Sequence, residues 1–117
     1  MIFYNRYGTP SVYIDDECYI YFYSGKCVGY IFNEYIYHFD GRHLGFFKNG
    51  WIRDKNGKCV LFTRNAKGGP ERRMKDIGRV KSQKSEIPDK KLREPILKKL
   101  DLREEWSELS STAFFKQ

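Results

Sequence analysis

Residues 35–47 read Tyr-Ile-Tyr-His-Phe-Asp-Gly-Arg-His-Leu-Gly-Phe-Phe, and this stretch decides the fold. Sixteen residues earlier, residues 19–31 follow the same pattern of aromatic residues and glycines. Residues 51–63 repeat it sixteen residues later, and residues 3–14 hold a more degenerate copy. Such regular spacing indicates that the first half of the chain is a tandem repeat whose copies must pack against one another.

Each copy has the composition of a β-hairpin, because aromatic and β-branched residues dominate both of its arms. Ser24-Gly25, Asp40-Gly41 and Asn56-Gly57 stand between the arms. We interpret these pairs as two-residue type I′ turns, which place Ile20 opposite Gly29 and Phe22 opposite Cys27. Four such hairpins are most simply closed into a ring, which protects the sheet edges. The alternative is a plain up-and-down meander folded into a small barrel.

The copy from Ile36 to Phe47, its flanking copies, and Gly68-Gly69-Pro70 in a basic stretch resemble the four-fold beta-flower family. The resemblance covers about residues 2–75, and the remaining tail is matched only loosely, as basic and variable. It implies a bacterial protein, mainly β, with four tandem hairpins around a pseudo-fourfold axis. It implies no activity and no functional residues.

The positive charge of the chain lies in its second half. Residues 1–63 carry 7 basic and 6 acidic side chains, residues 64–85 carry 8 and 2, and residues 86–117 balance at 7 and 7. We therefore divide the chain into a four-hairpin domain (1–63), a basic linker (64–88) and a helical tail (89–117). No apolar run approaches the ~18 residues that cross a bilayer, so no membrane association is expected. The N-terminus also lacks the pattern of a secretory signal.

The basic segment 64–85 is a candidate site for nucleic acid or another polyanion. It has no aromatic residues for base stacking, so a solvated linker is the competing interpretation. The residues proposed for polyanion binding are Arg64, Lys67, Arg72, Arg73, Lys75, Arg79, Lys81 and Lys84.

The tail is predicted to form two short helices. Pro95 suits the first position of one, which would include Ile96, Leu97 and Leu100. Asp101 would begin the second, in which Leu102, Trp106 and Leu109 share one face. This helix, with Phe114 and Phe115, is expected to dock on the same molecule or on a neighbour.

The predicted register brings several metal-ligating side chains to one end of the ring. Thiolate and imidazole are the usual zinc donors, and four of them would close a tetrahedral site. The competing interpretation is ordinary polarity at the hairpin tips, and we expect no cofactor. The candidate ligands are Cys27, His38, His43 and Cys59, and Asp54 would join the histidines in a hydrolytic acid–base cluster.

The opposite face of the hairpins is rich in aromatic residues. Tyrosine suits surfaces that are half apolar and half wet. This face is either a recognition surface or a packing face and subunit interface, and packing is the favoured interpretation. Its representative residues are Tyr19, Tyr21, Tyr35, Tyr37 and Trp51.

The functional expectation is a non-enzymatic module that acts by binding an unknown protein partner or by self-association into a homo-oligomer. Polyanion binding is the alternative, and a small metal-binding or hydrolytic protein using the His/Cys/Asp cluster is the third. No phosphate-cradling loop or dinucleotide fingerprint is present. Three cysteines without close spacing are not a disulfide framework, so we expect a reducing, cytoplasmic location.

Overall fold

The structure is a computed structural model that describes residues 1–16, 18–75 and 78–117. These residues form eight strands and one short helix, and none of them belongs to a helix long and apolar enough to cross a membrane. The elements are β1 (Ile2–Tyr4), β2 (Pro10–Tyr13), β3 (Tyr19–Phe22), β4 (Cys27–Phe32), β5 (Tyr35–Tyr37), β6 (His43–Lys48), β7 (Trp51–Asp54), β8 (Cys59–Phe62) and α1 (Ser111–Phe115).

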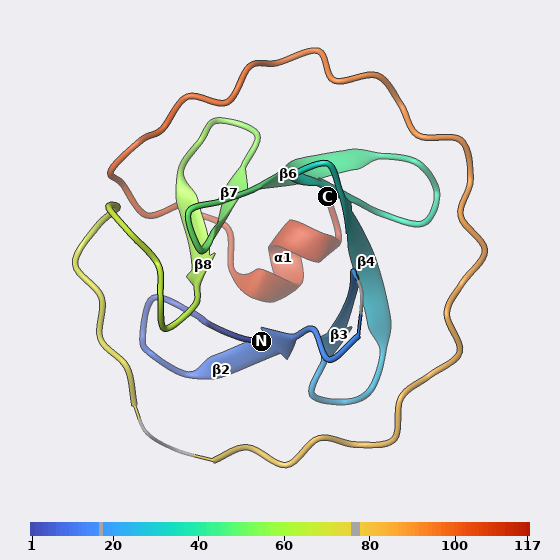
Figure 1. Ribbon diagram of the computed structural model, residues 1–117, viewed down its shortest axis with the longest axis horizontal. Helices are drawn as coiled ribbons and strands as arrows, with labels where there is room; N and C mark the ends of the chain where they lie inside the picture. The colour runs from blue at the N-terminus through green and yellow to red at the C-terminus, as the bar shows by residue number, and fades with distance from the viewer. Residues whose placement is uncertain (17, 76–77) are drawn as a thin grey trace.

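The strands close into an antiparallel barrel in which each strand pairs with its neighbours in the chain. The pair Tyr4 and Phe62 joins β1 to β8 and completes the ring. The four hairpins, β1–β2, β3–β4, β5–β6 and β7–β8, are arranged around one axis (Figure 1). We number them first to fourth. The predicted mainly β fold of four tandem hairpins is confirmed, and its strand order is that of an up-and-down barrel.

The turns at the hairpin tips are longer than the predicted two-residue type. Tyr21 pairs with Cys27, where Phe22 was expected, because a bulge interrupts the register after Ile20. The other three hairpins carry the same bulge. Each tip is a three-residue loop that ends in a glycine of positive φ, such as Gly25 at 93°. The turns with two positive φ angles lie between hairpins instead, at Asn33-Glu34 and Asn49-Gly50.

This bulge changes the face on which the bulged residues lie. Cys27, His43 and Cys59 pack among aromatic residues on the outer side of the barrel. The next residue in each hairpin, such as Val28, enters the central core instead. The predicted register, which placed Phe22 opposite Cys27, was therefore wrong at the hairpin tips, because a one-residue change of register exchanges the two faces of a strand.

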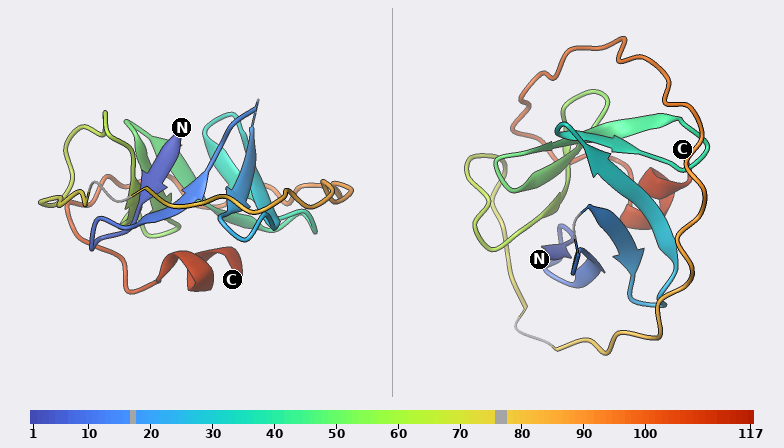
Figure 2. Two further views of the ribbon diagram at one scale, coloured as in Figure 1. Left: turned by 90° about the horizontal axis from the view of Figure 1, so that it is seen from below. Right: turned by 45° about the vertical axis from the view of Figure 1, so that its right-hand side comes forward.

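The central core is built from residues at equivalent positions of the four hairpins. Phe3, Ile20, Ile36 and Ile52 are all fully buried there. Helix α1 covers one end of the barrel (Figure 2), where Phe114 and Phe115 join the same core.

Two hairpins make room for α1 by carrying a glycine. Gly29 and Gly45 stand where the other two hairpins have Val12 and Leu61. A Cβ atom at Gly45 would lie 2.8 Å from the Phe114 ring. The ring of Phe115 therefore packs close to Gly29 of the second hairpin, and the ring of Phe114 packs close to Gly45 of the third.

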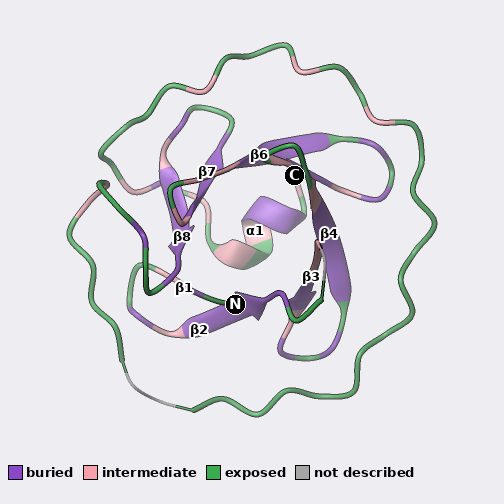
Figure 3. Cartoon of the chain, in the orientation of Figure 1, coloured by how far each residue is buried: buried purple, intermediate pink, exposed green. Residues whose placement is uncertain are grey.

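Residues 64–75 and 78–110, called the belt below, run around the outside of the barrel and return to the fourth hairpin (Figure 1). Their described part is mostly exposed, whereas the strands are mostly buried (Figure 3). The predicted helices over 95–100 and 101–109 were wrong, since these residues are not helical. Several of their backbone groups bond to the barrel, as Arg103 N–H does to the carbonyl of Gly57.

Candidate functional site: the aromatic outer face and the belt

The belt contacts the four hairpin tips in the same way. At each tip a belt N–H donates to the carbonyl of the tip glycine, at 2.8 to 3.3 Å. These donors lie nine or ten residues apart along the belt, so the belt has a repeat of its own that follows the four tips. The pairs are Lys75 with Gly8, Ser85 with Gly25, Glu94 with Gly41 and Arg103 with Gly57.

The belt also places cations over the aromatic outer face. Lys81 lies 4.3 Å from the ring centre of Tyr13, on the first hairpin. Lys90, nine residues later, lies 4.9 and 4.8 Å from the ring centres of Tyr19 and Tyr30, on the second. Arg72 lies 5.4 Å from Trp51, on the fourth. Such cation–π contacts contribute about 0.5–2 kcal/mol each. The basic belt and the aromatic face are therefore two halves of one interface.

The predicted aromatic surface lies largely beneath this interface. Tyr21, Tyr37 and Trp51 are buried, and Tyr19 and Tyr35 are half-buried. Burial raises the pKa of Tyr21 to about 12. These rings form the base on which the belt packs.

The predicted polyanion residues fall into two groups. One group already has partners: Arg79 donates to the carbonyl of Pro10 at 2.7 Å, and Lys81 and Lys84 pair with Asp15 at 3.1 and 3.3 Å. Arg72 belongs to this group through Trp51. Arg64, Lys67, Arg73 and Lys75 are exposed at the start of the belt, and Arg64 also has an interaction partner. All eight residues are exposed, but at least four of them already interact with other groups of the chain.

The four candidate metal ligands are not brought together. Cys27 lies in the tyrosine cluster of the second hairpin, Cys59 lies beside Trp51, and the His43 ring packs against Tyr37. His38 remains at the tip of the third hairpin, 3.2 Å from Asp40. Within residues 1–16, 18–75 and 78–117, no three His, Cys, Asp or Glu side chains converge in a way that could hold a metal ion. Burial raises the pKa of both buried thiols to about 11.

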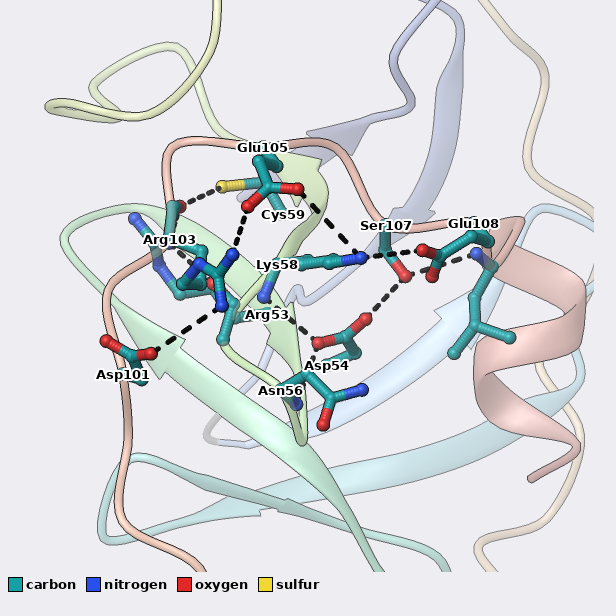
Figure 4. A network of polar contacts seen from close by, with 12 residues as sticks. Arg53, Asp54, Asn56, Lys58, Cys59, Asp101, Arg103, Glu105, Ser107 and Glu108 are labelled. Carbon is teal, nitrogen blue, oxygen red and sulfur yellow. Dashed lines mark hydrogen bonds and ion pairs between the residues drawn. The ribbon is translucent and has the colours of Figure 1, made fainter.

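Asp54 belongs to a polar network that fastens the end of the belt to the fourth hairpin (Figure 4). Its carboxylate accepts bonds from the backbone N–H groups of Asn56 and Lys58, and from the Ser107 hydroxyl at 2.6 Å. Arg53, also buried, donates to the carbonyls of Gly57 and Arg103. Since the carboxylate of Asp54 already accepts three bonds from the chain itself, its observed role is structural.

The third hairpin departs from the other three. Its outer pair, Tyr35 and Phe46, is equivalent to Tyr19 and Tyr30, yet none of the described cations lies over it. Lys99 stands nine residues after Lys90. Instead of a cation–π contact, a cavity of about 390 Å³ separates the pair from belt residues 96–100.

One exposed leucine of the belt, Leu97, lines this cavity, and a second, Leu92, lies five residues earlier on the belt. Leu92 is 95% exposed and Leu97 is 90% exposed. Within the described parts of the chain, none of the backbone N–H groups of residues 96–101 donates a hydrogen bond. Sequence reasoning missed this site because it placed Leu97 on a helix that begins at Pro95. The nine-residue interval between Lys81, Lys90 and Lys99 was the signal that would have indicated it.

Comparison with known protein families finds a match. The model of a family described as 4-fold beta flower protein matches residues 1–115, which extends the predicted range of 2–75 to the belt and α1. No curated protein and no solved structure matches the chain.

Proposed function

The chain belongs to the 4-fold beta flower family, and from that premise we propose that it is a non-enzymatic module that binds an acidic protein segment. The segment would dock on the belt at the third hairpin and place an apolar side chain in the cavity there. The family description names a fold, so this proposal rests on the local geometry.

The observation that carries the proposal is a cavity lined by the exposed Leu97, together with the exposed Leu92 five residues earlier on the belt. Its walls include the rings of Tyr35 and Phe46 and the side chains of Ile96 and Leu100. Buried apolar anchors in such pockets contribute most of the energy of many protein interfaces. The N–H groups of segment 96–101 can also pair with a strand of the partner.

Charge selects the kind of partner. Residues 90–99 carry five basic side chains against the single acid Glu94, a net charge of +4. The Glu94 carboxylate is occupied by the backbone N–H of His43, at 2.6 Å. A second copy of this chain, with its own net charge of +7, would be repelled by this surface. An acidic segment with apolar residues complements both the leucines and the lysines.

The proposed module would act in the cytoplasm. Cys27 and Cys59 are free thiols, as expected in a reducing compartment. The dispersal of the candidate ligands and the engagement of Asp54 within the fold support a non-enzymatic role.

Fluorescence anisotropy with a labelled peptide of alternating Glu and Leu tests the proposal. We expect saturable binding that weakens about tenfold or more in Leu92→Ser/Leu97→Ser, because two apolar contacts are lost. Val80→Ser is the matched control, since Val80 is 90% exposed on the belt between the first two hairpins. It should leave the affinity unchanged.

Three results would overturn the proposal. Equal binding by the leucine variant and the control would mean nonspecific charge attraction. Tighter binding of a single-stranded oligonucleotide than of the peptide would favour the polyanion function. A dimer in light scattering that Leu92→Ser/Leu97→Ser dissociates would favour self-association through this surface.

A further inference from the structure

A second cavity lies between the second and third hairpins, beside α1. Its volume is about 250 Å³. Phe22, Val28 and Phe115 supply its apolar surface, and the rings of Phe22 and Phe115 meet edge to face at 5.8 Å. These residues come from the central core, so the apolar part of the cavity is held by the packing of α1 against the barrel.

The polar lining of this cavity is basic. Lys26, Arg42, His38 and Lys116 line it, and no acidic side chain does. Arg42 pairs with Asp40 at 2.7 Å, whereas Lys26 and Lys116 make no ion pair with any residue that the structure describes. The ammonium groups of Lys26 and Lys116, which have no acidic partner among the described residues, and the guanidinium of Arg42 therefore surround the apolar lining of the cavity.

The pseudo-fourfold repeat provides an internal comparison for Lys26. Lys26, Arg42 and Lys58 each follow the tip glycine of their hairpin. Lys58 is neutralised by Glu108 at 2.7 Å and by Glu105 at 3.9 Å, both from the belt. The belt brings Ser85 to the second hairpin, where it binds the backbone of Cys27. No described acidic side chain neutralises Lys26 in this way, so its ammonium group can pair with a bound anion.

His38 adds a hydrogen-bond donor to the same cavity. Its Nδ1 accepts from the backbone N–H of Asp40 at 3.1 Å. The neutral ring then carries its proton on Nε2, and the protonated ring has two donors. Together with the guanidinium of Arg42, this arrangement suits the oxygen atoms of a phosphate or carboxylate group.

The neighbouring cavities around α1 have a different chemistry. The one between the fourth and first hairpins contains Glu108 beside Arg6. The one between the first and second hairpins contains Arg79 among hydroxyl groups, and Arg79 already donates to the carbonyl of Pro10. Of these three cavities, the one between the second and third hairpins therefore combines several basic side chains with no acidic one, whereas each of the others has a single arginine.

We propose that this cavity binds a small organic anion. Its phosphate or carboxylate group would contact Lys26, Arg42 and Lys116, and a compact apolar body would rest on Phe22 and Phe115. This site uses none of the residues of the belt surface proposed above, so the two proposals stand or fall separately.

Phenyl phosphate is a suitable probe, because it combines a phosphate group with one apolar ring. Titration of the full chain, followed by amide chemical shifts, should give saturable changes at Phe22, Val28 and Phe115. We expect inorganic phosphate, which lacks the ring, to bind more weakly at the same residues. A carboxylate analogue, benzoate, measures the preference between the two anionic groups.

Lys26→Ala/Lys116→Ala should weaken the binding of phenyl phosphate about tenfold or more, since two charge-assisted contacts are removed. Both lysines are exposed, so the variant should keep the near-ultraviolet circular dichroism of the native chain. Lys67→Ala/Lys91→Ala is the matched control, with the same change in net charge at exposed positions that do not line the cavity.

The proposal fails if phenyl phosphate does not saturate the native chain, or if the shifts occur away from the cavity. It also fails if the two double variants bind equally, because the attraction would then be a general effect of net charge. Equal binding of phenyl phosphate and inorganic phosphate would remove the role of the apolar floor.

Discussion

Single residues at the hairpin tips determine how closely the belt can approach. A Cβ atom at Gly25 would lie 1.9 Å from the carbonyl oxygen of Gln83, and one at Gly41 would lie 2.0 Å from that of Leu92. Both glycines also have a positive φ, which side chains rarely tolerate. The tip glycines therefore serve the turn and the belt at once. From the sequence, only their role in the turn could be predicted.

The turn types show the limit of that prediction. The dipeptide rule favours Asn-Gly and Asp-Gly at type I′ turns, yet Asp40-Gly41 and Asn56-Gly57 lie in three-residue loops. Asn33-Glu34 adopts the two positive φ angles instead, although glutamate is a poor residue for them. The pairing of Phe32 with Tyr35 in the closed barrel imposes this turn, and the barrel's closure is not a local property.

His43 is the residue whose protonation should affect stability. Burial lowers its pKa from the usual value, and Nε2 bonds to the carbonyl of Gly45 at 2.8 Å. The unfolded chain then binds more protons below about pH 6.5 than the folded chain does. We expect the melting temperature to fall as the pH is lowered from about 7.5 to about 5.5, as measured by circular dichroism.

Two variants isolate the contribution of His43. His43→Phe keeps a ring against Tyr37 but cannot take up a proton, so its melting temperature should fall less over the same range. His38→Phe removes the other histidine, which is half-exposed, and should retain the full decrease. Identical pH profiles for the native chain and His43→Phe would contradict this expectation.

Among the elements, α1 depends on the glycines of two hairpins. Alanine at Gly45 would place its Cβ 2.1 Å from the carbonyl oxygen of Arg53 and 2.8 Å from the ring of Phe114. We expect Gly45→Ala to lower the free energy of unfolding by about 1–3 kcal/mol, as overpacking in a core usually does. Urea unfolding followed by fluorescence measures this change.

Gly78→Ala is the control for Gly45→Ala. A Cβ at Gly78 has no atom within 4 Å, so the substitution should leave the urea midpoint unchanged. A Gly45→Ala variant as stable as Gly78→Ala would mean that α1 does not pack against the third hairpin as described.

The belt is the element that sequence reasoning described least well. Leu102, Trp106 and Leu109 have helical spacing, but Leu102 is half exposed while Trp106 packs on Trp51. Apolar spacing over a short segment is compatible with an extended chain that contacts a partner only at intervals. The belt's true period is set by the distance between neighbouring hairpin tips, and the nine-residue interval between Lys81, Lys90 and Lys99 is the trace of it within residues 64–110.

At the scale of the whole molecule, barrel, belt and helix form one unit. Belt cations cover Tyr13, Tyr19 and Trp51 from outside, and Phe114 and Phe115 fill the core from below. The sequence division at residues 63 and 88 separated segments by composition, but the hydrogen bonds from the belt to the tips cross both boundaries. The family match over residues 1–115 also spans all three segments.

We therefore expect a chain truncated after Thr63 not to fold. The truncated chain would expose the aromatic outer face and open the core at the position of α1. A chain of ~60 residues also buries only about 60% of the surface that its unfolded form exposes, so it has little stability to lose. Proton NMR should show poorly dispersed signals. Adding the peptide of residues 64–117 should restore dispersion, since it supplies the missing contacts. A well-dispersed spectrum for the truncated chain alone would contradict this expectation.

The two ends of the belt meet at one side chain. The carbonyl of Lys67 accepts from the indole N–H of Trp51 at 3.1 Å, and Trp106 packs on the same indole with ring centres 5.5 Å apart. These are the only two tryptophans in the sequence. The fluorescence of these two tryptophans, excited selectively, therefore reports on the place where both ends of the belt contact the barrel. The protein thus contains an intrinsic fluorescent probe of whether the ends of the belt are docked on the barrel, and no attached dye is needed.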